Sequence, residues 1–341
     1  MLKVGIVGVG FMGMIHYLAY QRIENVKVVA LCESFFKERL TGDWTKIKGN
    51  FGPQGTQMDL TGVKTYEKLE DLLADPDVDV VDICLPPAAH AASTIAALNA
   101  GKNVFCEKPI SLIAEEGAAM VDAAQKNGKM LMIGHVLPFF DAFNYIYQAQ
   151  QSGKFGKCLG GNFTRVISDP TWLKNFYSMA GSGGPMLDLH VHDAHFIRMM
   201  FGMPKAVRTL GRLRGDVPEY FNTHFVYNDS DLVVTATSGC IMQQARPFTF
   251  AYEVHFEKAT VFTDCFNNVP VTVLHEDGTI EKPEFPAGDD ITPFVNELTE
   301  ARNCFLEGKP SAMLDGVLAR DALVVCHKEI DSCNLRTQVM I

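Results

Sequence analysis

The 341-residue sequence lacks the segments that would place it in or across a membrane. It contains no run of about 18 uninterrupted apolar residues, so we expect no transmembrane helix. The N-terminal stretch MLKVGIVGVG is too short an apolar run for a signal peptide, and its glycines are more typical of a strand followed by a turn. These absences predict a cytoplasmic protein with no membrane partner.

The sequence also lacks the cysteine pairs of a disulfide framework or a zinc site. Its nine cysteines form no C-x-x-C pair, and several lie inside apolar runs. An odd number of dispersed cysteines of this kind is typical of reduced thiols in the cytoplasm. Basic residues are also fewer than acidic ones, with 30 Lys and Arg against 40 Asp and Glu. The net charge of −10 disfavours a nucleic-acid partner, because both molecules would be negatively charged.

The chain is long enough for two domains, and we place the boundary after residue 136, because the first hydrophobic pattern ends near residue 135 and a different one begins near residue 157. In residues 1–136, short apolar runs such as KVGIVGV, VKVVALC and NVFCE alternate with helical patterns such as AHAASTIAALNAG. Apolar strands that alternate with helices predict parallel βαβ units covered on both faces. The first domain is therefore expected to be an α/β domain built on a parallel sheet.

Residues 137–341 show long polar–apolar alternations such as KCLGGNFTRVIS and FTFAYEVHFEKATVF. They predict an α+β domain with an open, mostly antiparallel sheet of about six strands. Helices are expected at 185–201, 289–307 and 313–331. In the first domain, the stretch 40–62 is rich in glycine, threonine and polar residues, so we expect it to be a surface excursion.

The first motif is GVGFMG, in which Gly8, Gly10 and Gly13 form G-x-G-x-x-G around Phe11 and Met12. The motif follows an expected strand and opens an expected helix, which is the context that makes it informative. Glycines permit a tight turn and the close approach of a diphosphate, and the helix N-terminus offers free N–H groups. These five residues are candidate cofactor-binding residues.

Glu33 ends the second expected strand, about twenty residues after Gly13. A carboxylate at this place binds the ribose hydroxyls of the adenosine half and would repel a 2′-phosphate. We therefore expect NAD as the cofactor in preference to NADP. Lys37 and Arg39 follow closely, and a cation there can accommodate a phosphate or can be an ordinary solvated helix residue.

Ligands of open parallel sheets lie at the carboxyl ends of the strands. The strand VDICL ends at Pro86 and Pro87, with His90 soon after, and the strand NVFCE ends at Glu107 and Lys108. These five residues are further candidates for cofactor binding. An ammonium at Lys108 could also hold a substrate hydroxyl and lower its proton affinity, whereas the alternative is an ordinary ion pair with a neighbour.

The segment GGPMLDLHVHDAHFIRMMFG is expected to be a partly buried helix that carries polar residues. Asp188 and His192 are spaced i, i+4, so they share a helix face, and the carboxylate could orient the imidazole for proton transfer. For His190 and Asp193 we favour satisfied polar groups of the interior. His192 and His195 make a metal site conceivable, but the sequence shows no further ligand cluster and we expect no metal.

The blocks GIVGVGFMG, DVDVVDICLPPAAHAASTIAALNAGKNVFCEKPIS, SGKFGK and GGPMLDLHVHDAHFIRMMFG resemble the Gfo/Idh/MocA family (glucose-fructose oxidoreductase, inositol dehydrogenase, rhizopine catabolism). The resemblance covers nearly the whole chain. The family's catalytic lysine falls on Lys108, and its aspartate and histidine fall on Asp188 and His192. The resemblance implies an N-terminal Rossmann domain followed by a mostly antiparallel α+β domain. It also implies NAD(P)-linked hydride transfer at a carbinol carbon of a sugar, polyol or derivative.

The chain departs from the family pattern near its expected substrate site. His190 and His195 stand where the family commonly has glycine and aspartate, and His135 and Pro138 lie where many members carry arginine. The substrate-binding candidates are Lys108, His135, Trp172, Asp188 and His192.

Two other classes of function stay open. One is a glycosidase or lyase that holds NAD and returns the hydride, and the other is a non-catalytic binding protein, which the presence of Lys108, Asp188 and His192 disfavours.

The second domain is expected to mediate self-association. Its strands carry apolar residues on both faces: Val233 points to one side, and Leu232 and Val234 point to the other. One face of an antiparallel sheet is commonly left free, and a monomer would expose it as an apolar patch. We expect a homodimer or homotetramer formed through this sheet, unless the C-terminal tail CNLRTQVMI covers the face.

Overall fold

The computed structural model describes residues 1–341 and divides into two compact units. Unit 1 comprises Met1–Phe139 and Ala287–Arg320, and unit 2 comprises Phe140–Pro286 and Asp321–Ile341. The first boundary lies close to the expected one at residues 136 and 137. From the sequence we expected segment 287–320 to be part of the second domain, whereas in the structure it belongs to unit 1.

Unit 1 contains a six-stranded parallel sheet in the order β3-β2-β1-β4-β5-β6. Its strands are β1 (Leu2–Val7), β2 (Val26–Cys32), β3 (Lys64–Tyr66), β4 (Val80–Ile83), β5 (Asn103–Glu107) and β6 (Leu131–Gly134). Its helical segments are α1 (Phe11–Tyr20), η1 (Lys37–Thr41), α2 (Leu69–Leu73), η2 (Pro87–Ala89), α3 (His90–Asn99), α4 (Ala114–Asn127), η3 (Leu137–Phe139) and α7 (Thr292–Glu307). This confirms the predicted Rossmann arrangement.

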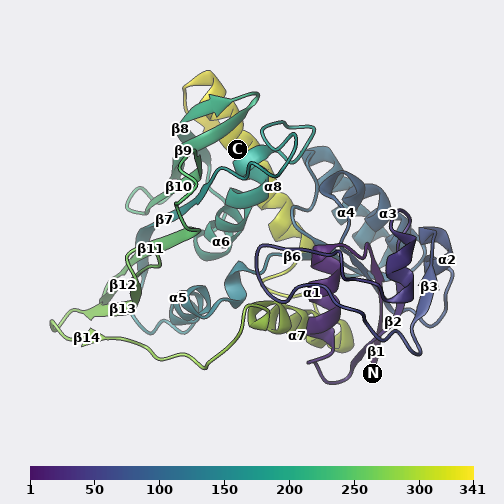
Figure 1. The fold of residues 1–341 in the computed structure, drawn as a ribbon. Coiled ribbons are helices and arrows are strands. Elements are labelled where there is room, and N and C mark those ends of the chain that lie inside the picture. The colour runs from purple at the N-terminus through teal and green to yellow at the C-terminus, as the bar shows by residue number, and fades with distance from the viewer. The chain divides into compact units, whose positions relative to one another are not determined.

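Helices cover both faces of this sheet, as its apolar strands require. Val4 and Ile6 are fully buried in the core that also contains residues of α1 and α7, and Figure 1 shows these two helices side by side. Gly5 points to the opposite face, where an added Cβ would lie 3.2 Å from the side chain of Leu72 on α2. The helix α7 therefore completes the α1 face, which explains why segment 287–320 belongs to unit 1.

The excursion at 40–62 lies largely at the surface, as expected, but a few buried side chains anchor it in the core. Trp44 has an exposed fraction of 0%, and its ring packs edge-on against Tyr17 of α1 at 5.0 Å between centroids. Its indole Nε1 donates to the carbonyl of Arg39 at 2.8 Å. Phe51 stacks on Phe294 of α7 at 5.4 Å. A tryptophan in this otherwise polar stretch was the sign of a buried anchor, and the overall composition of the stretch did not reveal it.

Unit 2 contains a nine-stranded sheet in the order β14-β13-β12-β11-β7-β10-β9-β8-β15. Its strands are β7 (Cys158–Ser168), β8 (Ala206–Arg214), β9 (Val217–Val226), β10 (Val233–Ile241), β11 (Thr249–Phe256), β12 (Ala259–Asp264), β13 (Val269–His275), β14 (Ile280–Glu281) and β15 (Val339–Met340). The central pair β7–β10 is parallel and the other pairs are antiparallel. The mostly antiparallel architecture is confirmed, although nine strands replace the expected six.

The helical segments of unit 2 are α5 (Asp141–Gln151), η4 (Met186–His190), α6 (Val191–Phe201) and the part of α8 (Gly316–Leu335) from Asp321 onward. Aromatic contacts join α5 and α6 to the sheet: Phe143 packs on Tyr252 and Phe163 on Phe196. The C-terminal tail forms the edge strand β15 beside β8, so it extends the sheet and does not cover its open face. None of the helices combines the length and the apolar character needed to cross a bilayer.

We predict that Trp44→Ala destabilises unit 1, because the substitution empties a fully buried site between the excursion and α1. The expected loss in the free energy of unfolding is about 3–5 kcal/mol, measured by urea unfolding followed by circular dichroism. The matched control is Trp172→Ala, which removes the chain's other tryptophan from a side chain that is 64% exposed. Equal stability of the two variants would contradict the anchoring role of Trp44.

Candidate active site

The three glycines of the first motif each meet a different steric demand. Gly8 has a φ of +93°, and an added Cβ would lie 2.7 Å from the carbonyl oxygen of Cys84. A Cβ on Gly13 would lie 2.1 Å from the carbonyl oxygen of Gly8, so α1 can approach the strand only with glycine there. A Cβ on Gly10 would meet nothing within 4 Å. This is the division of roles expected for a dinucleotide loop, in which the second glycine leaves room for the diphosphate.

The N-terminus of α1 is suited to a negatively charged group. Phe11 and Met12 are its first residues, Gly10 provides no side-chain cap, and the first turn contains no acidic residue. The free N–H groups and the positive end of the helix dipole therefore favour a diphosphate. Phe11 also packs edge-on against Phe51, so the anchored excursion borders the loop.

Glu33 lies at the end of β2 and has an exposed fraction of 7%. Its Oε2 accepts the N–H of Val9 at 3.0 Å, and its Oε1 accepts the N–H of Phe35 at 2.9 Å. Arg39 donates to the carbonyl oxygen of Val9 at 2.8 Å. Glu33 and Arg39 thus both fix the start of the glycine loop. Lys37 forms an ion pair with Glu67.

His90 has a different environment from the one expected of a cofactor contact. It is fully buried, and its Nδ1 and Nε2 each lie 2.8 Å from a backbone carbonyl oxygen, that of Pro109 and that of Leu85 respectively. The side chain therefore ties the segment after β4 to the segment after β5. Pro86, which is exposed, and Pro87, which is half-buried, begin the short helix η2 at the end of β4.

Lys108 follows β5 directly and is half-buried. Its backbone N–H donates to Oε2 of Glu107 at 3.1 Å. Because β1, β4 and β5 are neighbouring parallel strands, Lys108 lies at the same edge of the sheet as the glycine loop. This is the edge at which open parallel sheets bind their ligands.

Beneath this edge lies a cluster that the sequence analysis missed, formed by His16, Asp82, Glu107 and Glu297. We refer to it as the buried His16 cluster. His16 Nδ1 is 2.9 Å from Asp82 Oδ2, and its Nε2 is 3.0 Å from Glu107 Oε1. Cys84 is close enough to share a metal with His16 and Asp82. However, the ring nitrogens of His16 already face carboxylates, so a protonated imidazole satisfies this geometry with no added cation.

The helical candidates lie in unit 2. Asp188 lies in the π-helical turn η4, and His192 lies in the first turn of α6; both are half-buried. Single π-helical turns occur frequently at functional sites. Asp193 forms a buried two-bond ion pair with Arg165 at 2.6 and 3.0 Å. His190 lies 2.8 Å from Ser238 Oγ and 3.0 Å from Glu329 Oε1. The expectation that His190 and Asp193 are satisfied interior groups is confirmed.

The two remaining substrate candidates differ in exposure. His135 follows β6 in unit 1 and is fully buried, whereas Trp172 of unit 2 is 64% exposed. His195 is buried within α6. Lys108 and His135 belong to unit 1, whereas Trp172, Asp188 and His192 belong to unit 2.

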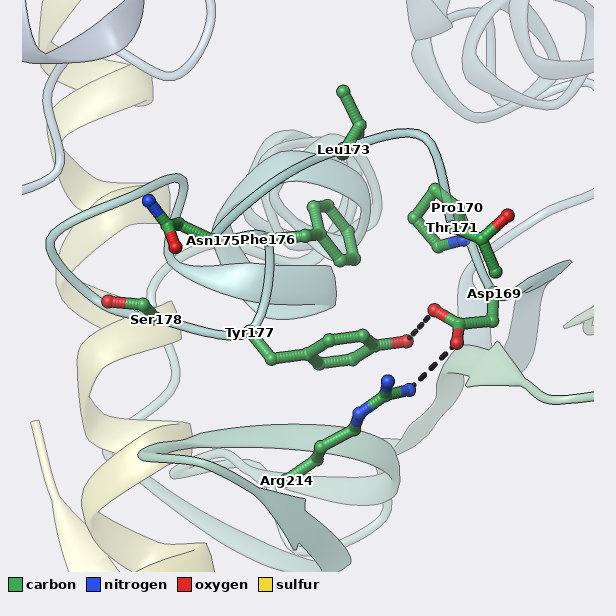
Figure 2. A pocket seen from close by; sticks show the side chains of 9 residues that line it. All are labelled: Asp169, Pro170, Thr171, Leu173, Asn175, Phe176, Tyr177, Ser178 and Arg214. Atoms are coloured by element: carbon green, nitrogen blue, oxygen red, sulfur yellow. Dashed lines mark hydrogen bonds and ion pairs between the residues drawn. The ribbon is translucent and has the colours of Figure 1, made fainter.

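Unit 2 also has an open cavity of about 460 Å³ after β7. It is lined by Asp169, Pro170, Thr171, Leu173, Asn175, Phe176, Tyr177, Ser178 and Arg214. Asp169 accepts hydrogen bonds from Tyr177 at 2.7 Å and from Arg214 at 2.8 Å. Figure 2 marks both contacts with dashed lines. Burial acts to raise the pKa of Asp169, but these two donors outweigh it and hold the pKa below its usual range. No motif in the sequence marked this group.

Comparison with known proteins identifies the family of both domains. Residues 2–135 match an oxidoreductase family with an NAD-binding Rossmann fold, and residues 143–262 match the GFO/IDH/MocA C-terminal domain. An inositol 2-dehydrogenase of Salmonella typhimurium is 34% identical over 160 residues, which cover 46% of this chain and 44% of that protein. A myo-inositol 2-dehydrogenase of Thermotoga maritima is 25% identical over 295 residues, which cover 81% and 79%.

The alignments with several other curated relatives cover less of the chain than this. The chain spans about half the length of the first curated relatives, for example 53% of the uncharacterized oxidoreductase YrbE of Bacillus subtilis, at 28% identity. A solved structure of levoglucosan dehydrogenase in complex with NADH and levoglucosan has a TM-score of 0.84 at 20% identity, covering 100% of this chain and 99% of that chain. That likeness shows the shared fold. With both of its domains matched, the chain belongs to the Gfo/Idh/MocA family of oxidoreductases.

Proposed function

We propose that this protein is an NAD-dependent dehydrogenase that transfers a hydride between the nicotinamide and a carbinol carbon of a sugar, polyol or sugar derivative. The observation that carries the proposal is the position of Lys108 at the sheet edge that also bears the glycine loop. A dinucleotide bound to that loop extends along this edge. An ammonium there can stabilise negative charge that develops on a substrate oxygen.

The proposed roles follow from the chemistry of the side chains. Bound NAD supplies the hydride acceptor. Lys108 holds the substrate hydroxyl, and His192 accepts its proton as general base. Asp188 orients the imidazole of His192 and stabilises the imidazolium that forms. His135 and Trp172 are proposed to contact the rest of the substrate.

The names of the relatives support a sugar or polyol as the substrate class. Two are inositol dehydrogenases, and one structural neighbour is a levoglucosan dehydrogenase. A screen of polyols, aldoses, uronates and amino sugars, followed by NADH absorbance, tests the proposal. Steady formation of NADH supports it. Substrate turnover with no net NADH would instead indicate a glycosidase or lyase that returns the hydride, and binding with no turnover would indicate a non-catalytic protein.

We predict that the protein binds NAD(H) more tightly than NADP(H), because the Glu33 carboxylate would lie beside the ribose hydroxyls and repel a 2′-phosphate. Lys37 is engaged by Glu67, and Arg39 by the carbonyl of Val9. Glu33→Gln should weaken NAD(H) binding by about 10- to 100-fold, since hydrogen bonds to charged groups contribute about 1.5–3 kcal/mol. Fluorescence titration measures both cofactors. Tighter NADP(H) binding by the wild type would reject the preference.

We predict that His192→Asn lowers kcat by about 10²–10⁴-fold, because removal of a general base has this typical cost. The measurement is steady-state NADH formation at neutral pH with a substrate found in the screen. The control is His224→Asn, which changes an exposed histidine on β9 and should leave kcat near the wild-type value. A near-wild-type kcat for His192→Asn would defeat the assignment.

We also propose self-association as a dimer or tetramer through the open face of the unit 2 sheet. Val234 is 1% exposed and Val233 is 64% exposed, as the alternation predicted. The open face is more polar than expected, because the polar Asn222 of β9 lies on it. The neighbour of Asn222 across the strands is Leu210 of β8, an apolar residue that is 57% exposed. Light scattering at micromolar concentration should give a multiple of the 37.7 kDa chain mass. Leu210→Arg should lower that mass without weakening NAD(H) binding, and a monomeric wild type would contradict the proposal.

A further inference from the structure

The imidazole of His16 lies between two carboxylates in the interior of unit 1. Its Nδ1 is 2.9 Å from Asp82 Oδ2, and its Nε2 is 3.0 Å from Glu107 Oε1. His16 and Asp82 are 0% exposed, and Glu107 is 7% exposed. A neutral imidazole has one N–H donor, whereas two donors are needed to satisfy two ionised carboxylates. An imidazolium, with an N–H on each ring nitrogen, satisfies both contacts.

The charged and titratable groups around His16 come from four elements. They are Tyr20 on α1, Asp82 and Cys84 at the end of β4, Glu107 on β5, and Glu297 on α7. Burial alone would lower the pKa of His16, but the Asp82 carboxylate outweighs it and raises the pKa well above the ordinary value.

Glu297 differs from the other two carboxyl groups of the cluster. It is fully buried, and neither of its oxygens has a hydrogen-bond partner. Burial raises its pKa well above the usual range, and the nearby Glu107 charge adds to the effect. Burial thus favours the neutral form of Glu297, and the two ring nitrogens of His16 face Asp82 and Glu107.

Glu107 connects this cluster to Lys108. One carboxylate oxygen faces His16, and the other accepts the backbone N–H of Lys108 at 3.1 Å. The strand β5 is held on both sides by β4 and β6, so its end is well fixed up to Glu107. Beyond it, the Glu107 carboxylate links the His16 ring to the backbone N–H of Lys108.

We propose that His16 is a positioning residue for Lys108: it orients the Glu107 carboxylate, which in turn holds the Lys108 backbone at the edge of the sheet. This inference rests on the proposed function, in which Lys108 holds the substrate oxygen. It goes further, because it assigns a role in the reaction to a residue of the cofactor-binding helix that is sealed from solvent.

Two substitutions separate the two hydrogen bonds of His16. The amide nitrogen of asparagine takes approximately the place of Nδ1, so His16→Asn keeps a donor to Asp82 and loses the donor to Glu107. The longer side chain of His16→Gln brings its amide nitrogen to the place of Nε2, so it keeps the donor to Glu107 and loses the donor to Asp82. Both variants remove the same positive charge from the interior, so they form a matched pair.

The expected result is a split between the two variants. His16→Asn should lower kcat by about 100-fold, the typical cost of a misplacement of about 1 Å, whereas His16→Gln should lose much less. The dissociation constant for NADH should differ between them by no more than about threefold, since both leave the glycine loop unchanged. Equal losses of kcat, or a larger loss in His16→Gln, would show that His16 has only a structural role.

A second readout does not depend on turnover. The rate of reductive methylation of the Lys108 amine, read by mass spectrometry of the folded protein, reports the accessibility and basicity of the amine, which change when it is displaced. His16→Asn should change this rate and His16→Gln should preserve it, while the exposed Lys126 of α4 reacts equally in all three proteins. If the wild type turns over no sugar, the labelling still tests the positioning, and equal Lys108 rates in all three would overturn it.

The pH dependence gives the sign of the charge effect. Because the folded-state pKa of His16 is raised, its stabilisation is fully present below the unfolded value of about 6.5 and is lost as pH rises through the folded-state value. The stability advantage of the wild type over His16→Gln should therefore shrink at alkaline pH in thermal unfolding. An advantage that grows with pH would contradict an imidazolium at His16.

If neither His16 variant folds, Glu107→Gln tests the same link from the other side. With its amide oxygen facing His16, the glutamine presents an NH₂ group to the Lys108 N–H, and a donor cannot accept this hydrogen bond. The variant should change the Lys108 labelling rate and lower kcat. Wild-type values for both would overturn the proposal.

Discussion

The ion pair of His16 with Asp82 and Glu107 is the interaction on which unit 1 depends. Two carboxylates at the ends of neighbouring strands are buried beneath α1, and burying unpaired charges is costly. One imidazolium joins the helix that follows the glycine loop to the strand that precedes Lys108. A single buried group thus couples the cofactor-binding end of the sheet to the residue proposed to hold the substrate. Unit 2 repeats the principle with His190, which joins Ser238 of the sheet to Glu329 of α8.

The sequence predicted the parts of the fold that local patterns encode. The glycine spacing and the strand before it located the dinucleotide loop, and Glu33 was placed correctly at the end of β2. Continuous apolar runs in the first part of the chain give way to polar–apolar alternation in the second. This change located the transition from the parallel to the antiparallel sheet. These features are local, because backbone sterics and side-chain periodicity act over a few residues.

What the sequence could not predict depends on contacts between distant residues. His16 reads as an ordinary residue of a helix, and its partners lie 66 and 91 positions away in the sequence. Glu297 resembles a solvent-facing acid of α7 until the packing of α7 on α1 is known. His90 follows a strand end, as a cofactor contact would, but it bonds to two backbone carbonyls. Trp44 was hidden in a stretch whose composition indicated a surface loop.

The return of the chain to unit 1 at α7 affects how the protein can be synthesised. The apolar face of α1 and the buried His16 cluster both need residues 292–307, and these follow the whole of the large sheet of unit 2. The Rossmann sheet is synthesised before the sheet of unit 2, but the face that α1 covers stays incomplete until residues 292–307 have been made. Unit 1 therefore cannot follow the usual order, in which an N-terminal domain finishes folding before the next domain emerges. The cofactor-binding half cannot finish folding until segment 287–320 has been made, and unit 2 in turn needs Asp321–Ile341.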